Sequence, residues 1–160
     1  MTEATVTPHT ELSKLTGEWE GIARVWFQPD KVEDESPATG TMRPVMDGKF
    51  IIHEYKGSFK GKLLEGLAII GYHADLKKYQ MAWIDSFHTG TGIIFSEGKK
   101  DAKEISVLGS WAYVTPEIEQ HWGWRTEFEI KSDNEIVITA YNISPSGEEA
   151  KATEVVYKRK

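Results

Sequence analysis

The chain has 160 residues, with 25 acidic and 19 basic side chains and a formal net charge of −6. Apolar residues make up 39% of it, enough for one buried core in a single domain of this size. The acidic balance argues against nucleic acid and against a membrane surface as partners, because both attract basic proteins. The sequence contains no cysteine, which excludes disulfides, thiolate catalysis and cysteine–zinc sites.

The first residues predict little regular structure. Residues 1–8 are polar and are interpreted as a flexible N-terminal tail, without the basic start and apolar stretch of a signal peptide. No window of 18 apolar residues occurs, so a cytoplasmic location without membrane contact is expected. The stretch HTELSKLTG then predicts a short helix, with Thr10 as N-cap, Glu11 in the first turn and Gly17 as the stop.

The rest of the chain reads as strands. Segments of about ten residues, rich in Trp, Tyr, Ile, Val and Thr, alternate with turn signals. The stretch 28–38 is interpreted as a long acidic loop, because it holds Pro29, Pro37 and several carboxylates. Ten strands are predicted, over residues 18–27, 39–46, 49–57, 65–73, 78–86, 91–96, 103–113, 121–131, 135–143 and 149–159.

The connections decide the expected architecture. Apart from 28–38 they are of hairpin length, which indicates neighbouring antiparallel strands rather than crossovers through helices. No later helix is available to cover a sheet face, so the strands must close on themselves. Residues 9–160 are therefore expected to form one all-β domain, an up-and-down antiparallel β-barrel of about ten strands that can hold a small ligand.

Two ends of the chain resemble calycin barrels. LSKLTGEWEG carries the Gly-x-Trp opening in Gly17 and Trp19, and Arg159 in EVVYKRK matches the arginine that packs over this tryptophan in lipocalins. The stretch GYHADLKKYQMAWIDS is similar to an uncharacterised bacterial domain family placed near the calycins. The resemblance covers about residues 12–160. It implies a calycin-like barrel with structural roles for these three residues and no established activity.

Two better-known relatives of this barrel offer contrasts. Nitrobindin-like barrels bind haem through a histidine near the chain end, whereas the last histidine here is His121; no haem or other cofactor is expected. Fatty-acid-binding proteins hold a carboxylate with an Arg-x-Tyr pair, whereas Tyr157 here precedes Arg159. The resemblance therefore does not imply either ligand.

The stretch KYQMAWIDSFHTG holds the main candidate site. Tyr79, Met81, Trp83, Asp85 and Phe87 fall on alternate positions, so in a strand all five point to one face, which is expected to be the barrel interior. A carboxylate in an apolar interior is unfavourable by several kcal/mol, or its pKa rises, unless donors surround it. The aspartate therefore either accepts hydrogen bonds from the protein or contacts a ligand, and the sequence leaves both open.

Further inward candidates come from other strands. Trp124 shares a face with Trp122, Thr126, Phe128 and Ile130, and Trp111 shares one with Val107 and Gly109. Aromatic rings give large apolar walls with polar edges, the usual composition of a small-molecule pocket. In IIHEY, Glu54 has the parity of Phe50 and Ile52, which makes it a second candidate for an inward acid. His53 has the parity of Ile51 and Tyr55, and the sequence does not decide which set faces in.

The histidines do not have metal-ligand spacing. His73, Asp85 and His88 could meet at one barrel end, but no metal site is expected. The predicted function is binding of a small hydrophobic molecule by Glu54, Trp83, Asp85, Trp111 and Trp124. One alternative is an enzyme acting on a small hydrophobic or carbonyl-bearing molecule, with Asp85 or Glu54 as general base. A further alternative is a filled-core interaction protein without a ligand.

Overall fold

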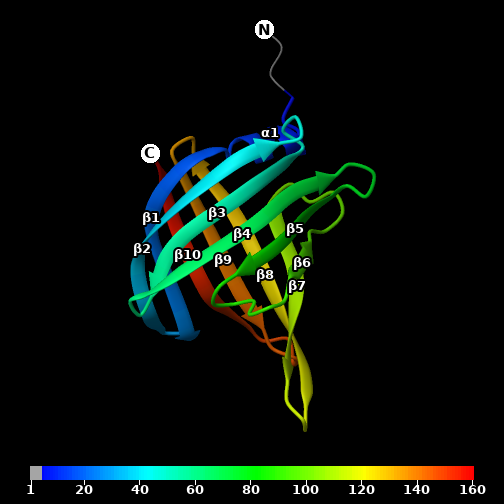
Figure 1. Cartoon of the computed structure of the whole chain (residues 1–160). Helices are drawn as coiled ribbons and strands as arrows, with labels where there is room; N and C mark the ends of the chain where they lie inside the picture. The colour runs from blue at the N-terminus through cyan, green and yellow to red at the C-terminus, as the bar shows by residue number, and fades with distance from the viewer. Residues whose placement is uncertain (1–4) are drawn as a thin grey trace.

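The computed structural model describes residues 5–160 and shows a closed antiparallel barrel of ten strands with one short helix (Figure 1). The predicted all-β, up-and-down barrel is confirmed: each strand pairs with its neighbours in sequence, and β1 pairs with β10 to close the ring. The elements are α1 (Pro8–Ser13), β1 (Gly17–Gln28), β2 (Lys31–Val45), β3 (Phe50–Phe59), β4 (Lys62–His73), β5 (Lys78–Asp85), β6 (Ile94–Glu97), β7 (Ile105–Val114), β8 (Glu119–Ser132), β9 (Glu135–Ile143) and β10 (Glu149–Arg159).

The helix begins earlier than the sequence indicated. Thr7, not Thr10, is the N-cap, and its hydroxyl accepts a hydrogen bond from the Thr10 amide at 3.2 Å. The Thr7 amide donates in turn to the Thr10 hydroxyl at 2.8 Å. Pro8 occupies the first turn, where its fixed φ and missing N–H are favourable. Of the predicted tail, residues 1–4 lie outside the described part of the chain, and Thr7 and Pro8 belong to the helix start.

The predicted acidic loop over 28–38 is wrong. β1 and β2 are joined by a turn of two residues, Pro29 and Asp30, and the carboxylates that follow lie on an extended strand. They find cationic partners on neighbouring strands and turns: Glu35 accepts from Arg24 at 2.6 Å and Glu33 from Lys60 at 2.7 Å. A run of acids favours a loop locally. Partners that are distant in sequence stabilise the strand instead.

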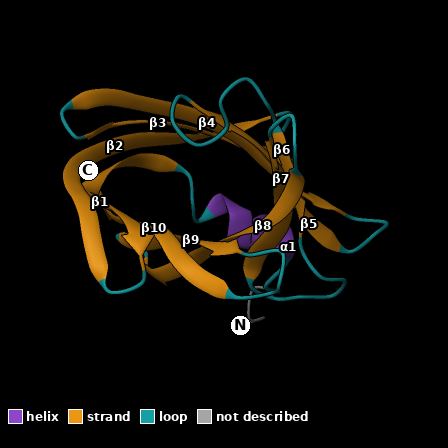
Figure 2. Cartoon of the chain, turned by 90° about the horizontal axis from the view of Figure 1, so that it is seen from below, coloured by secondary structure: helices purple, strands orange, loops and turns teal. Residues whose placement is uncertain are grey.

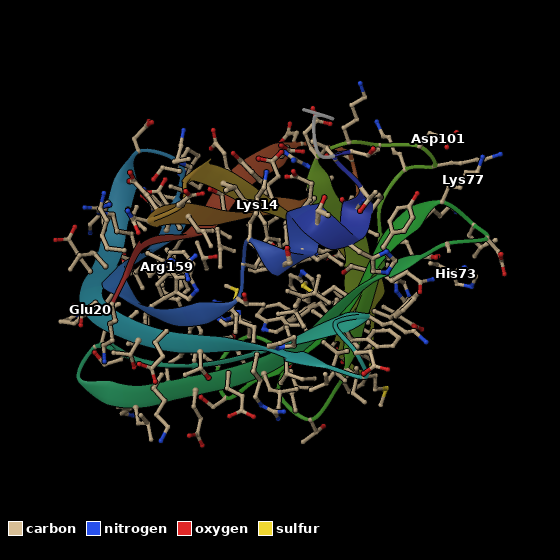
Figure 3. All side chains as sticks on the ribbon, turned by 90° about the horizontal axis from the view of Figure 1, so that it is seen from above. Lys14, Glu20, His73, Lys77, Asp101 and Arg159 are labelled. Atoms are coloured by element: carbon tan, nitrogen blue, oxygen red, sulfur yellow. The ribbon has the colours of Figure 1, made fainter. Side chains whose placement is uncertain are left out.

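The helix closes one end of the barrel. Leu12 and Leu15 are completely buried, and the indole N–H of Trp19 donates to the Leu15 carbonyl at 2.9 Å. The Arg159 guanidinium lies 4.3 Å from the Trp19 ring centroid, the arrangement that the resemblance implied, and its Nη1 donates to the Thr16 carbonyl at 2.6 Å. Figure 3 looks onto this end and shows Arg159 on the same end as the helix.

Gly17 is required by this closure. Its φ is +140°, and a Cβ added there would lie 2.2 Å from Nη1 of Arg159. We expect Gly17→Ala to lower the free energy of unfolding by about 1–3 kcal/mol, because the backbone is strained and the arginine must move. Urea denaturation measures the change. Gly57→Ala is the control, since its methyl would meet ordinary contacts at 3.5 Å and beyond; equal effects at the two glycines would contradict the assignment.

The candidate site lies toward the opposite end. His9 of α1 packs edge-on against Tyr72 near the end of β4, at 6.1 Å between ring centroids, so the helix lies where β5 begins. Asp85, the last residue of β5, therefore lies at the other end of the barrel. Figure 2 looks into the barrel from that end, with α1 across the far end. The single helix in residues 5–160 has six residues, too few and too polar to span a membrane.

Candidate functional site

A cavity of about 110 Å³ lies inside the barrel. Most of the interior around it is filled by packed side chains, among them Ile51, Ile70 and Ile136, which are completely buried. The cavity walls come from strands on both sides of the barrel. The side chains that define its chemistry are His53, Tyr55, Met81, Trp83, Asp85, His88, Trp124, Thr126, Phe128 and Tyr157.

Two stacked indoles and a tilted imidazole form one wall. The indoles of Trp83 and Trp124 are nearly parallel, with centroids 5.3 Å apart and planes inclined by 23°. The imidazole of His88 packs against both, at 5.6 Å and 5.5 Å. The predicted inward orientation of the two tryptophans is confirmed, since both are buried and line the cavity. They supply a flat apolar surface against which a small ligand can pack.

Asp85 also faces inward, and the protein satisfies it. Its side chain is only 1% exposed. Oδ1 accepts from the amides of Phe87, at 2.9 Å, and of His88. Oδ2 accepts from the Tyr55 hydroxyl at 2.9 Å and lies 2.7 Å from Nδ1 of His88. Burial acts to raise the pKa of the Asp85 carboxyl, but the hydrogen bonds and charge of His88 and the two amides outweigh it and lower the pKa.

Gly66, on the strand between β3 and β5, lets Tyr55 reach the Asp85 carboxylate. Tyr55 of β3 is paired with Gly66 of β4, and Gly66 is paired with Asp85 of β5. A Cβ at Gly66 would lie 2.2 Å from the tyrosine ring, so the ring lies over the bare glycine backbone and its hydroxyl reaches the next strand. That hydroxyl also accepts from the indole N–H of Trp83 at 2.8 Å. Burial and the charge of Asp85 raise the pKa of Tyr55.

The neighbours of His88 hold its ring in one orientation. Its Nδ1 is hydrogen-bonded to the Asp85 carboxylate, and its ring is held by Trp83, Trp124 and Phe87. An ionised carboxylate can only accept, so Nδ1 carries the hydrogen. The other ring nitrogen, Nε2, makes no hydrogen bond to any residue in 5–160, and His88 is one of the residues that line the cavity.

Thr126 contributes an unsatisfied hydroxyl. The residue is 6% exposed, it lines the cavity, and Oγ1 has no hydrogen-bond partner among the described residues. Ser96 Oγ is a second such atom, but it packs beside Gly109 away from the cavity. A buried hydroxyl without a partner is unfavourable by about 1–3 kcal/mol.

His53 and Tyr157 form a second buried pair on the cavity wall. The His53 Nε2 lies 3.1 Å from the Tyr157 hydroxyl, and both residues are almost completely buried. Gly40 makes room for them, because a Cβ there would lie 2.3 Å from the Tyr157 oxygen. Burial lowers the pKa of His53 to about 4 and raises the pKa of Tyr157, so both groups are neutral near pH 7.

The structure decides the open question of Glu54, the second candidate for an inward acid, and places it outside the barrel. In β3 the set with Ile51, His53 and Tyr55 faces the interior, and Glu54 lies on the outer wall with a side chain that is 52% exposed. Its carboxylate pairs with Arg43 at 3.5 Å and borders an open outer groove of about 870 Å³. Glu54 is therefore absent from the interior site.

Three other expected positions also differ. Trp111 does not line the cavity; it stacks on Trp122 at 5.6 Å, and its indole N–H donates to Asn142 at 3.0 Å. Phe87 is partly exposed, because β5 ends at Asp85 and alternation ends with it. His73 is the last residue of β4 and lies at the same end of the barrel as the helix (Figure 3), so it does not join Asp85 and His88. In residues 5–160, no three acidic or histidine side chains gather as metal ligands would.

Sequence reasoning did not select His88, Tyr55 or Thr126 for the site. Thr126 has the inward parity of Trp124, which placed it on the lining but gave no sign that its hydroxyl would lack a partner. The spacing Asp85-x-x-His88 after a strand is compatible with an aspartate accepting from amides two and three residues on, as it does here. That turn is the one local signal that could have indicated the pair.

Fold and site together define a closed β-barrel with a small, aromatic-walled internal cavity. A family model described as "Protein of unknown function (DUF1579)" matches residues 5–159, so the chain belongs to this family. A search of curated proteins finds no match.

Proposed function

We propose that this protein binds a small, largely apolar molecule with one hydrogen-bonding group inside the barrel. The observation that carries the proposal is the Thr126 hydroxyl, which is buried, belongs to a residue of the cavity lining and has no partner among the described residues. A ligand carbonyl or hydroxyl would satisfy it, and Trp83 and Trp124 would supply the apolar contact.

The volume limits the ligand. A protein cavity of about 150 Å³ accommodates benzene, and this one is about 110 Å³. The part of the ligand that lies inside the barrel is therefore of roughly benzene size or smaller. A calycin-like binding barrel is consistent with this picture, supported by the packing of Arg159 over Trp19. The cavity favours this reading over a filled-core interaction protein.

Asp85 and Glu54 are poor candidates for the general base of an enzyme. Both carboxylate oxygens of Asp85 accept hydrogen bonds from the protein, and its lowered pKa makes it a weaker base. Glu54 lies outside the barrel. The interior site therefore supports binding as the primary function.

Cyclopentanone and cyclopentane test the proposal as a matched pair, since they differ by one carbonyl. The protein is titrated with each probe and its tryptophan fluorescence is recorded. We expect tighter binding of the ketone than of the hydrocarbon. In Trp83→Phe we expect a smaller fluorescence change and weaker binding of the ketone. Thr126→Val should weaken cyclopentanone binding about 5-fold, the effect of one neutral hydrogen bond, and leave cyclopentane binding unchanged. No binding of either probe, or equal loss of both in Thr126→Val, would contradict the proposed site.

A further inference from the structure

We propose that His88 is a general base that moves a proton on a small apolar carbonyl compound bound in the cavity. This inference rests on the proposed function and adds a reaction to it. Its basis is the arrangement of His88, a residue of the cavity lining: Nδ1 is bonded to a buried carboxylate, and Nε2 has no partner among residues 5–160.

The surroundings of His88 are those of a held base. The bond from Nδ1 to Asp85 measures 2.7 Å, and the ring packs on Trp83 and Trp124, so the imidazole is fixed in tautomer and in plane. The ionisable groups around it are Asp85 on β5 and Tyr55 on β3, which share one hydrogen bond. The carboxylate stabilises the imidazolium that forms when Nε2 accepts a proton. Nε2 itself has no partner among residues 5–160 that would block it.

A hydroxyl without a partner, on another residue of the cavity lining, indicates the substrate class. The Thr126 hydroxyl can donate to a carbonyl oxygen. Donation to that oxygen stabilises the negative charge that develops when a neighbouring carbon loses a proton. One base and one donor are sufficient for keto–enol proton transfer, which needs no co-reactant. Aromatic walls and a volume of about 110 Å³ restrict the substrate to a small apolar carbonyl compound.

The reaction is a proton transfer that passes through an enolate. His88 Nε2 takes a proton from the carbon next to the carbonyl; the C–H bond breaks, an N–H bond forms, and the electron pair moves into an enolate. The enolate oxygen accepts the hydrogen bond of Thr126. The proton on Nε2 exchanges with solvent. Nε2 then returns a proton to the same carbon, which restores the ketone, or to the enolate oxygen, which gives the enol. In D₂O the product is the ketone deuterated next to its carbonyl.

Deuterium exchange into cyclopentanone, followed by proton NMR in D₂O, tests this reaction with the full chain. The wild-type protein is expected to exchange the ketone about 100-fold faster than His88→Gln, the usual contribution of a positioned base. His121→Gln is the matched control, since that imidazole is exposed and pairs with Glu119 outside the cavity lining; it should exchange at the wild-type rate. Near-UV circular dichroism of the tryptophans verifies that each variant is folded.

The outcomes separate the two proposals. Binding of cyclopentanone without exchange above buffer would overturn the base role of His88 and leave the binding function standing. Exchange that persists in folded His88→Gln would also overturn it. Absence of binding would remove both. Exchange that is lost in His88→Gln, with cyclopentanone affinity retained, supports both.

Discussion

Asp85→Asn is expected to lower the free energy of unfolding by about 2–4 kcal/mol. Oδ1 faces two amide donors, and Oδ2 faces the Tyr55 hydroxyl and the His88 ring. In one orientation the NH₂ of an asparagine would point at the two amide donors. In the other it would displace the hydrogen bonds of Tyr55 and His88, so that the hydroxyl must rotate and the imidazole must change its tautomer. The substitution also removes the charge that holds His88. Urea denaturation at pH 7 measures the loss.

Glu54→Gln is the matched control, because it removes one negative charge from the same region of the barrel without a change of shape. Glu54 is half exposed and has one long contact, to Arg43 at 3.5 Å. We expect a change below about 0.5 kcal/mol, as is usual for a surface ion pair. A loss at Asp85 as small as that at Glu54 would show that the carboxylate is not held as described.

Acidification from pH 7 to pH 4 is expected to lower the free energy of unfolding by about 3 kcal/mol through His53 alone. In the folded protein the pKa of His53 is lowered by burial to about 4. In the unfolded chain it is about 6.5. Between these values the unfolded chain binds a proton that the folded protein does not. This contribution is therefore undiminished above pH 6.5 and is lost progressively as the pH falls toward 4.

His53→Gln isolates this effect, since glutamine can still bond to the Tyr157 hydroxyl but does not titrate. Urea denaturation of both proteins between pH 7 and pH 4 should give a smaller decline in the variant by about 3 kcal/mol. Asp85 acts in a lower range: its pKa is lowered, so its contribution is present above about pH 4, the unfolded value, and is lost below it. Parallel declines in the two proteins would show that His53 is accessible to protons in the folded state.

The sequence alone predicted the barrel and the inward orientation of Trp83, Asp85 and Trp124. Alternation along a strand is a local property, so once a segment is recognised as a strand its two faces follow. Hairpin-length connections without later helices then require the strands to close. Alternation could not decide whether His53 or Glu54 faces inward, because both sets of the strand carry apolar residues.

The tertiary structure decided the remaining features. Closure of the barrel turns His53 inward, and cross-strand cations hold the acids of β2 in a strand. The turn after β5 brings His88 back to Asp85, and the strands around Thr126 leave its hydroxyl without a partner in the described chain. Each of these depends on residues far apart in sequence, or on a chain reversal that breaks alternation. The sequence by itself therefore determined the faces of the strands, and packing across the barrel determined which polar groups meet and that the Thr126 hydroxyl has no partner in the described chain.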